Sequence, residues 1–379
     1  MSASKLIGLF PELLGPGGVQ EAGRQTASAL TTIAADRGWS TSFLSLNDPL
    51  QTHSLDVSEG QIFFRGFSRS KLNFAFSALG QSSKQTHVVL AAHPHLAVPA
   101  ALMKMKSPRA KTVVMSHGIE VWKPLPVLRH KALLAADFVL APSSDTAKKL
   151  AEVQGVSTER IRRLAWPLGT SFLQLANAAA KPEAPRGLPA ERFILTVGRW
   201  HASEKYKGAD DLIRAVAQLR GPFPGLQLVA VGGGSDLPRL RRLAMELGIP
   251  DHVHFLEGLT REELAGCYAR AEIFALPSAG EGFGLVFLEA MAFGRPVVGA
   301  SCGGITDIVE DGVNGLLVQP SNQSRLAEAL DQLLRDESMR ARLGLCGAEI
   351  VRHKFSFENF RHGLEQILRE CGLDSSHAA

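Results

Sequence analysis

The sequence contains few cysteines and no long apolar run. All four cysteines, Cys267, Cys302, Cys346 and Cys371, lie in the last third of the 379 residues, and none belongs to a Cys-x-x-Cys pair. This distribution argues against a disulfide framework and a zinc site, and it favours a reducing cytosol. No run approaches the roughly 18–20 apolar residues of a spanning helix, and the apolar stretch near the N-terminus is too short for a signal peptide. We therefore expect a cytoplasmic protein.

Charge is unevenly distributed along the chain, whose net charge is +4. Residues 1–175 contain 19 Lys and Arg against 11 Asp and Glu, whereas residues 176–379 contain 22 against 26. The basic clusters are Lys104, Lys106, Arg109 and Lys111, then Arg160, Arg162 and Arg163. Such clusters suit an anionic lipid surface or an acidic acceptor, although ordinary solvated surface explains any single one. We expect no nucleic acid partner, because stacking aromatic residues are not interleaved with the basic ones.

Strand-like apolar runs alternate with helix-like segments, a pattern that predicts parallel sheets with helices on both faces. The length predicts about two domains, and the alternation recurs in each half of the chain. In the first half we expect strands at 5–10, 42–45, 87–91, 112–115 and 138–141, and helices at 21–37, 96–105 and 144–154. In the second half we expect strands at 193–197, 226–231, 253–256, 273–276 and 296–300.

Two acids, Glu281 and Glu289, flank the turn Gly282-Phe283-Gly284 and an apolar stretch that indicates the start of a helix. A turn followed by a helix N-terminus offers a site for an anion, because unpaired N–H groups and the positive end of the helix dipole converge there. A carboxylate on each side can bind hydroxyl groups, and an anion between two polyols is the pattern of a nucleotide sugar. Two acids at this spacing also arise by chance, around a helix between two turns.

The frame around these acids is more specific than the acids themselves. It consists of Pro277-Ser278, Gly282-Phe283-Gly284, Glu289-Ala290, Gly294-Arg295-Pro296-Val297-Val298 and Gly303-Gly304. This run closely resembles the donor-binding signature of the retaining GT-B glycosyltransferases of family 4 (glycosyl transferases group 1). The resemblance implies two Rossmann-like, doubly wound domains that face a cleft. It also implies transfer of a hexose from a UDP- or GDP-sugar to a glycan or lipid-linked acceptor, in the synthesis of a cell-surface polysaccharide or glycolipid.

The resemblance assigns a role to each half of the chain. Residues 1–175 would form the acceptor-side domain and residues 192–354 the donor domain. Residues 176–191, where three prolines and several alanines interrupt the periodic pattern, have the composition of a linker. Residues 355–379 would hold a last helix, introduced by Ser356, that crosses back to the first domain, and a tail.

Several donor contacts follow from the family pattern. Glu281 would bind hydroxyl groups of the hexose, and Glu289 would bind the ribose diol. The backbone N–H groups of Phe283, Gly284 and Leu285 would meet phosphate or sugar oxygens. The loop around Gly258 and Leu259 would receive the nucleobase.

Two cations follow the strand predicted at 193–197. Arg199 comes just after its carboxyl end, and Lys207 precedes a glycine at the start of the next helix. Glycosyl transfer leaves negative charge on a diphosphate, and fixed cations stabilise that charge. In the family both cations point at the donor phosphates, although Lys205 competes with Lys207 here. No two aspartates are separated by one residue, so the metal-binding Asp-x-Asp motif is absent. We expect no metal and no cofactor besides the nucleotide-diphosphate sugar as co-substrate.

The first half contributes a histidine and a glycine loop. His117 follows the strand predicted at 112–115 and, by the resemblance, contacts the transferred sugar; a buried structural histidine is the alternative. Gly17 and Gly18 follow the first strand and would lie against the phosphates and the sugar. His93 and His95 would either line the acceptor pocket or cap a turn. The triplet Gly232-Gly233-Gly234 is explained equally well by ligand contact and by a tight turn.

The sequence departs from the family at two places, Pro167-Leu168-Gly169-Thr170 and Gly303-Gly304-Ile305-Thr306-Asp307. Neither departure removes the proposed donor contacts, but both argue against naming one substrate. A sugar phosphorylase of the same fold and a non-catalytic sugar-binding protein remain as alternatives. The expected partners are a nucleotide sugar and a glycan or lipid-linked acceptor. The basic first domain would allow peripheral contact with an anionic membrane at its cytoplasmic face.

Overall fold

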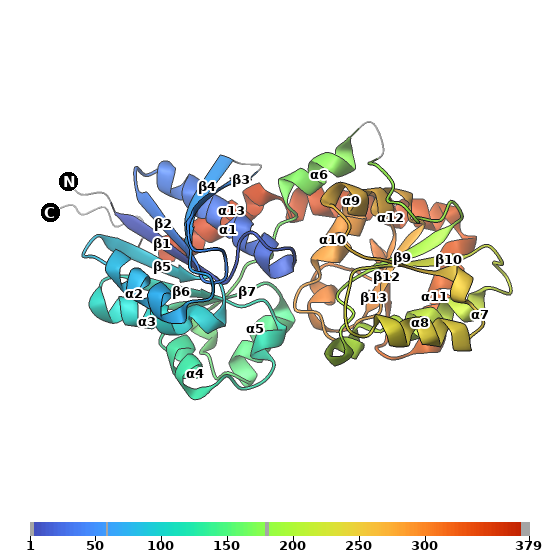
Figure 1. Cartoon of the computed structure of the whole chain (residues 1–379), viewed down its shortest axis with the longest axis horizontal. Coiled ribbons are helices and arrows are strands. Elements are labelled where there is room, and N and C mark those ends of the chain that lie inside the picture. The colour runs from blue at the N-terminus through green and yellow to red at the C-terminus, as the bar shows by residue number, and fades with distance from the viewer. Residues whose placement is uncertain (1–3, 58–59, 179–181, 373–379) are drawn as a thin grey trace. The chain divides into compact units, whose positions relative to one another are not determined.

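The computed structural model describes residues 4–57, 60–178 and 182–372. The chain forms two compact units, one made of Met1–Thr170 with Phe355–Ala379 and the other of Ser171–Lys354 (Figure 1). Each unit is a predominantly parallel sheet covered by helices, so the predicted α/β class is confirmed.

The first unit is built on an eight-stranded sheet with the order β3-β4-β2-β1-β5-β6-β7-β8, in which every pairing is parallel except β3 with β4. Its strands are β1 (Lys5–Phe10), β2 (Ser40–Ser45), β3 (Thr52–Val57), β4 (Gly60–Gly66), β5 (Thr86–Ala91), β6 (Lys111–Met115), β7 (Phe138–Ala141) and β8 (Ile161–Arg163). Its helices are α1 (Gly18–Ala35), α2 (Lys71–Gln81), α3 (Ala97–Lys106), α4 (Val127–Leu134), α5 (Ser144–Glu152) and α13 (Phe357–Glu370).

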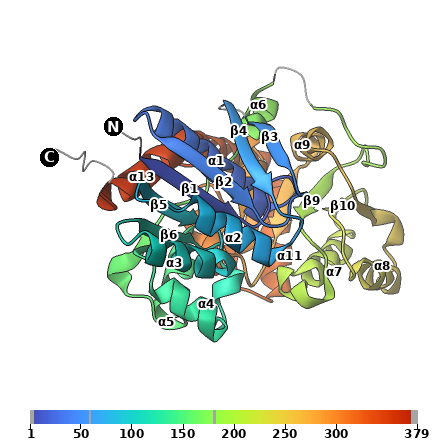
Figure 2. The same ribbon diagram turned by 60° about the vertical axis from the view of Figure 1, so that its left-hand side comes forward.

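Helices cover both faces of this sheet. Helix α1 and helix α13 lie on one side, and α2, α3 and α4 lie on the other (Figure 2). The central strands are apolar because both of their faces are buried, which explains why their positions were predictable. The sequence analysis missed β3, β4 and β8. β3 alternates exposed and half-buried residues at the edge of the sheet, and β8 is only three residues long.

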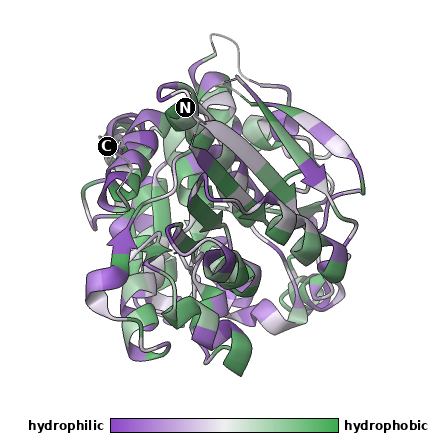
Figure 3. Ribbon diagram, turned by 90° about the vertical axis from the view of Figure 1, so that its left-hand side faces the viewer, coloured by the Kyte–Doolittle hydropathy of each residue, from purple (hydrophilic) through white to green (hydrophobic). Residues whose placement is uncertain are grey.

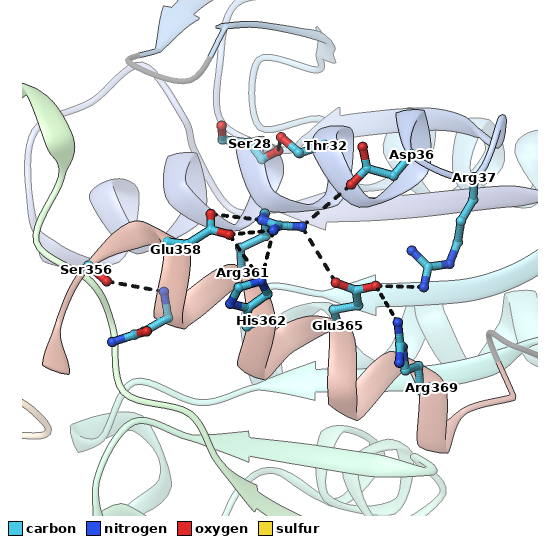
Figure 4. A network of polar contacts seen from close by, with 11 residues as sticks. Ser28, Thr32, Asp36, Arg37, Ser356, Glu358, Arg361, His362, Glu365 and Arg369 are labelled. Carbon is cyan, nitrogen blue, oxygen red and sulfur yellow. Dashed lines mark hydrogen bonds and ion pairs between the residues drawn. The ribbon is translucent and has the colours of Figure 1, made fainter. Parts of the chain in front are cut away.

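The last helix belongs to the first unit, as expected from the resemblance. Ser356 caps α13 by accepting a hydrogen bond from the backbone N–H of Asn359 at 3.3 Å. Its apolar face buries Phe360, Leu364 and Leu368, and α13 lies beside α1. A polar network ties the two helices together (Figure 4): Arg37 donates to Glu365 at 2.7 Å, and Arg361 lies 3.6 Å from Asp36.

The second unit contains a six-stranded sheet with the order β11-β10-β9-β12-β13-β14, in which every pairing is parallel. Its strands are β9 (Phe193–Val197), β10 (Gln227–Val231), β11 (Val253–Leu256), β12 (Ile273–Leu276), β13 (Val297–Ala300) and β14 (Gly315–Val318). The helices are α6 (Thr170–Asn177), which begins at the unit boundary, α7 (Ala209–Leu219), α8 (Leu237–Glu246), α9 (Arg261–Arg270), α10 (Leu285–Ala292), α11 (Gln323–Arg335) and α12 (Glu337–Lys354). Strands β9, β10, β12 and β13 are buried almost throughout. In Figure 3 the first unit faces the viewer, and its helices carry hydrophobic and hydrophilic residues side by side.

The structure divides the chain at 170/171, five residues before the predicted end of the first domain at 175. Helix α6 continues to Asn177, into the range 176–191 that we interpreted as a linker, because alanine and leucine favour helix over coil. Residues 182–192 form neither helix nor strand, which agrees with their prolines and glycine. Positions 179–181 of the predicted linker, and the predicted tail at 373–379, lie outside the described residues.

Candidate functional site

The order of strands reverses once in the second sheet. From β9 the chain proceeds outward to β10 and β11, then returns to the other side of β9 and proceeds to β12, β13 and β14. Loops that leave β9 and β12 therefore diverge, and open α/β sheets bind ligands in the crevice at this point, beyond the carboxyl ends of the strands. Arg199 and Lys207 follow β9, while Glu281 and helix α10 follow β12. The fold thus gathers the predicted donor residues at one edge of one sheet.

The segment that carries Arg199 is held rigidly by its neighbours. Trp200 is buried, and its indole N–H donates to the Val231 carbonyl at 3.2 Å. Gly232 and Gly234 both have positive φ, and a Cβ on either would lie about 2 Å from a backbone oxygen of Gly198 or Trp200. Packing against the β9 loop therefore accounts for these two glycines of the triplet.

The two predicted cations share one carboxylate. The Arg199 guanidinium lies 2.9 Å from Oε1 of Glu204, and the Lys207 ammonium lies 3.1 Å from Oε2. The side chain of Arg199 is 70% exposed, whereas that of Lys207 is 11% exposed. Lys205 is exposed. The pKa of Asp236 is lowered mainly by its hydrogen bond with Arg239, and the charge of Lys205 adds to this effect. Lys207 is therefore the lysine that belongs to this cluster.

Glu281 lies in the electrostatic field of the same cluster. Burial raises the pKa of Glu281 above its usual 4.5, while the Lys207 ammonium and a hydrogen bond from Ser278 act in the opposite direction. Burial, with the carboxylates of Glu204 and Glu281, also raises the pKa of Tyr206 to about 12. The site thus combines two cations with two acids, one of which is poorly solvated.

Backbone contacts fix the loop that presents Glu281. The N–H of Ala279 donates to the Tyr206 carbonyl at 2.7 Å, which ties the loop after β12 to the segment carrying Lys207. The N–H of Gly304 donates to the Glu281 carbonyl at 2.7 Å. A Cβ on Gly304 would lie 2.4 Å from the Gly282 carbonyl oxygen, so this glycine permits a close backbone approach that a larger residue would prevent.

Helix α10 begins directly after this loop. Its N-cap, Gly284, has φ of 102°, which favours glycine, and it provides no side chain to cap the first turn. Within the helix, Glu289 accepts a hydrogen bond from the hydroxyl of the buried Tyr268 at 2.8 Å. Burial raises the pKa of Tyr268, and this contact raises it further. The contact also orients the Glu289 carboxylate. Phe283 is buried, and Leu285 is half-buried.

Gly258 and Leu259 lie in the loop after β11, at the same edge of the sheet. Gly258 is exposed, has φ of 70°, and would leave a Cβ in open space. Its conformation favours glycine, but nothing packs against it. The loop then enters α9 through a capping box between Thr260 and Glu263.

The first unit has its own reversal of strand order, between β1 and β5. The loop after β1 is held from two sides: the buried Asp48 carboxylate accepts from the N–H of Leu13 at 2.7 Å, and Arg24 donates to the carbonyls of Leu13 and Gly15. Gly17, with φ of 124°, is the N-cap of α1, and Gly18 is the first residue of that helix. The predicted glycine loop is therefore a fixed turn at the start of a long helix.

Three histidines follow β5 and β6. The rings of His93 and His117 are stacked, with their centroids 5.7 Å apart. The ring centroids of His93 and His95 lie 4.4 Å apart. Burial, and next the neighbouring His117, lowers the pKa of His93 to about 3. Nδ1 of His93 accepts from the backbone N–H of His95, so His93 caps the turn. His117 is half-buried, and its Nε2 lies 2.8 Å from the Ala92 carbonyl oxygen.

Comparisons with known proteins agree with this arrangement. A family model described as glycosyl transferases group 1 matches residues 182–348. A GDP-mannose-dependent alpha-(1-6)-phosphatidylinositol monomannoside mannosyltransferase of Mycobacterium tuberculosis is 32% identical over 298 residues, which are 71% of this chain and 74% of that protein. The chain belongs to the glycosyl transferases group 1 family. A second member, a D-inositol 3-phosphate glycosyltransferase of Nocardia farcinica, is 38% identical over 260 residues, 65% of this chain and 55% of that protein.

Solved structures identify the fold of this glycosyltransferase as GT-B. Sucrose-phosphate synthase of Thermosynechococcus elongatus matches with a TM-score of 0.79 at 24% identity, covering 98% of this chain and all of that one. HepE of Anabaena, solved with UDP, matches with a TM-score of 0.71 at 19% identity and covers 97% of this chain and all of that one. At these identities the likeness establishes the fold alone.

Sequence reasoning about this glycosyltransferase missed three supporting residues. Glu204 stands inside an irregular insertion with no recognisable period, Tyr268 looks like an ordinary apolar position of α9, and Asp48 precedes a proline in a loop. Tyr268 and Asp48 contact partners that are distant in the sequence. Glu204 contacts a nearby arginine from an irregular turn. Only the sequence Glu204-Lys205-Tyr206-Lys207 gave a signal, since it places an acid between candidate cations.

In the part of the chain that the structure describes, no group of three or more His, Cys, Asp and Glu side chains is arranged to hold a metal ion. No helix within 4–57, 60–178 or 182–372 has the length and apolar character needed to cross a bilayer.

Proposed function

We propose that this glycosyltransferase is a retaining enzyme of family 4 that moves a hexose from a nucleoside-diphosphate sugar to a glycan or lipid-linked acceptor. The observation that carries the proposal is the cluster of Arg199, Lys207 and Glu281 at the strand reversal of the second sheet. Such a reversal is where ligands bind in open α/β sheets, and this one combines two cations for a diphosphate with an acid for hydroxyl groups.

The reaction needs positive charge at the leaving group. The bond between the anomeric carbon and the diphosphate oxygen breaks, a bond from the acceptor oxygen to that carbon forms on the same face, and the leaving phosphate takes the acceptor proton. Arg199 and Lys207 stabilise the charge that develops on the diphosphate, and the first N–H groups of α10 assist them. This scheme assigns no role to a metal or to a resident cofactor.

The remaining donor contacts are those that the family resemblance implies. Glu281 binds hexose hydroxyl groups and Glu289, oriented by Tyr268, binds the ribose diol. Backbone N–H groups of Phe283, Gly284 and Leu285 meet phosphate or sugar oxygens. The base rests on the loop at Gly258 and Leu259.

On the acceptor side, His117 contacts the transferred sugar, and the turn at Gly17 and Gly18 approaches the phosphates. A carbonyl oxygen can only accept a hydrogen bond, so the contact with Ala92 places a proton on Nε2 of His117. In the neutral ring Nδ1 is then an acceptor. We therefore propose that His117 accepts a hydrogen bond from a sugar hydroxyl.

GDP-mannose is the first donor to test. A relative that aligns with 71% of this chain is named as a GDP-mannose-dependent enzyme. The names of two relatives suggest acceptors that contain inositol phosphate or phosphatidylinositol. UDP-hexoses remain in the same proposal, since the cluster contacts the diphosphate and sugar common to both donors. With such donors and a lipid-linked acceptor, we propose that the enzyme acts in the cytoplasm, at the inner face of the membrane.

The test is a thermal-shift screen against GDP-mannose, UDP-glucose, UDP-N-acetylglucosamine and the free diphosphates. A ligand at 100 times its Kd adds about 2.7 kcal/mol to apparent stability, so a true donor raises the melting temperature clearly. NMR of the product formed with that donor then reports the anomeric configuration. No shift with any nucleotide would refute the proposal, and sugar 1-phosphate released from a disaccharide by inorganic phosphate would establish a phosphorylase instead.

A further inference from the structure

Three neighbouring helices of the first unit expose large apolar side chains. Six such residues have exposed fractions between 40% and 76%: Leu72 and Phe76 on α2, Leu102 and Met105 on α3, and Val127 and Leu128 on α4. Isolated exposed apolar residues are common on protein surfaces, but contiguous groups mark interaction sites. We call the outward side of α2, α3 and α4, as defined by these six residues, the three-helix face.

Helical spacing shows that the apolar residues on α2 and α3 point away from the core. On α2 the buried residues are Phe74 and Ala78, one turn apart. Leu72 and Phe76 are also one turn apart, on the opposite side of the same helix. Helix α3 has the same arrangement, because it buries Ala97, Ala100 and Met103 and exposes Leu102 and Met105. These helices are therefore apolar on two sides, and only one side is used by the fold.

The three helices are packed side by side. Helix α3 contacts α2 on one flank and α4 on the other, and all three lie on the same side of the first sheet (Figure 2). The outward residues of α2 and α3 therefore lie on neighbouring helices, and Val127 and Leu128 lie at the start of the third. The three-helix face is formed by consecutive helices of a single unit.

The charge of this region has one sign. Residues 60–136 contain 11 Lys and Arg and a single acid, Glu120. Helices α2, α3 and α4 contain no acid at all, and their basic residues are Lys71, Lys104, Lys106, Arg129 and Lys131. Lys71, Lys106 and Lys131 are exposed. An apolar surface among cations fits an anionic bilayer, whose head groups attract each nearby Lys or Arg by about 1 kcal/mol.

The basic clusters singled out from the sequence are partly neutralised in the structure. Lys104 and Lys111 both lie close to Asp137, at 2.6 and 3.7 Å. Arg162 pairs with Glu370 at 2.6 Å. Of these clusters, the three-helix face retains the exposed Lys106, which lies there with Lys71 and Lys131 among apolar residues.

We propose that the three-helix face docks on the surface of an anionic lipid bilayer. Phe76 and Met105 enter the boundary between head groups and acyl chains, while Lys71, Lys106 and Lys131 contact the acidic head groups. Apolar burial and electrostatic attraction act together in such interfacial binding. The proposal deepens the acceptor part of the proposed function, because a lipid-linked acceptor is presented at the same surface. Docking itself does not require a donor nucleotide.

The test is sedimentation of the full-length protein with vesicles of phosphatidylcholine alone and of phosphatidylcholine mixed equally with phosphatidylglycerol. We expect binding to the anionic vesicles only, with a loss at high salt because screening weakens surface charge interactions. The double variant Phe76→Ser, Met105→Ser should bind about tenfold or more weakly, since each CH₂ withdrawn from the boundary costs about 0.8 kcal/mol. Both residues are exposed, so the folded state should be unaffected, and circular dichroism checks this.

Met245→Ser is the matched control. Met245 is a methionine on α8 of the second unit and is 59% exposed, so its replacement removes a similar surface group outside the three-helix face. Unchanged vesicle binding by the double variant, or equal binding of the native protein to neutral and anionic vesicles, would overturn the proposal. So would a dimer in analytical ultracentrifugation without lipid that the double variant abolishes, since the face would then hold a second copy.

The thermal-shift screen with nucleotides separates this proposal from the proposed function. A double variant that retains the native nucleotide response but loses vesicle binding supports docking alone. A native protein that binds vesicles but no nucleotide refutes the donor assignment and leaves docking intact.

Discussion

The two units share one topology and place different chemistry on it. Each is a doubly wound sheet with one reversal of strand order, between β1 and β5 in the first and between β9 and β12 in the second. At the second reversal stand two cations and two acids, whereas at the first stand a glycine turn and a group of histidines in which His93 stays neutral over most of the pH range.

This difference indicates that the fold supplies the location and that the loops supply the function. A charged leaving group requires fixed opposite charge, which the second unit provides. At the matching position the first unit presents a glycine turn and imidazole rings, and the proposed function assigns sugar hydroxyls to both units. The comparison therefore predicts that charge-changing substitutions alter turnover mainly when they are made in the second unit.

Glu281→Gln should have the largest effect. We expect turnover to fall about 10²–10³-fold, because the hexose contact loses its charge. The pKa of Glu281 is raised, so the protonated acid stabilises the folded state. This contribution is complete below the ordinary pKa of 4.5 and is lost as the pH rises through the raised pKa of the folded state. The glutamine variant, which mimics the protonated acid, should therefore be more stable than the native protein at pH 7 and equally stable at acid pH. Steady-state kinetics and denaturant titrations at both pH values measure these changes.

Full activity of the Glu281→Gln variant would show that the reaction does not need the Glu281 carboxylate. Loss of activity together with loss of stability would mean instead that Glu281 supports the fold.

Lys207→Ala should reduce turnover about 10²-fold through lost stabilisation of the diphosphate. Lys205→Ala is the matched control, since Lys205 is two residues away and exposed. Isothermal titration with GDP and UDP should show weaker binding for Lys207→Ala and no change for Lys205→Ala. The opposite result would mean that Lys205, and not Lys207, binds the diphosphate. The diphosphate would then not lie beside Glu281.

Glu204→Gln should strengthen nucleoside-diphosphate binding about tenfold, roughly 1.4 kcal/mol. The Glu204 carboxylate contacts Arg199 and Lys207 and therefore competes with the phosphates for both cations. The product should then leave more slowly, and product inhibition by GDP or UDP should increase. Weaker binding would show that Glu204 serves to position the cations, in which case Glu204→Asp should restore part of the affinity.

His93→Asn should have the smallest effect, and only at acid pH. The pKa of His93 is lowered to about 3 from 6.5, so its contribution to stability is present above 6.5 and is lost as pH falls toward 3. Asparagine retains an acceptor for the His95 N–H but does not titrate. Urea unfolding between pH 7 and 4 should show a shallower loss of stability in the variant. Identical curves for the native protein and the variant would contradict the assignment.

The sequence predicted the parts of the fold that have a strong period. Buried strands such as β1 and β9 are continuous apolar runs, and their limits were predicted correctly as 5–10 and 193–197. The edge hairpin of β3 and β4 was missed, because residues exposed on both faces show no such run. The register of the parallel strands was not predictable either, since it depends on pairing between segments far apart in the chain.

The candidate site divides in a similar way. Glu281, Glu289, Arg199 and Lys207 were found because glycines and strand ends mark their loops, and their catalytic and binding roles remain predictions. Glu204 and Tyr268 were not found, since their importance depends on which side chains they contact. The same holds for the outward apolar residues of α2 and α3, which have the same composition as core residues and differ only in the direction they face.

By itself the sequence determined the class of fold, the two-unit organisation and the loops in which we expect the donor contacts, because apolar period and glycine placement are local properties. Only the tertiary structure decided that Lys207 and not Lys205 joins Glu204, that Nε2 of His117 meets the Ala92 carbonyl, and that apolar residues of α2 and α3 face outward. These properties depend on distances between residues remote in sequence, which folding alone brings together.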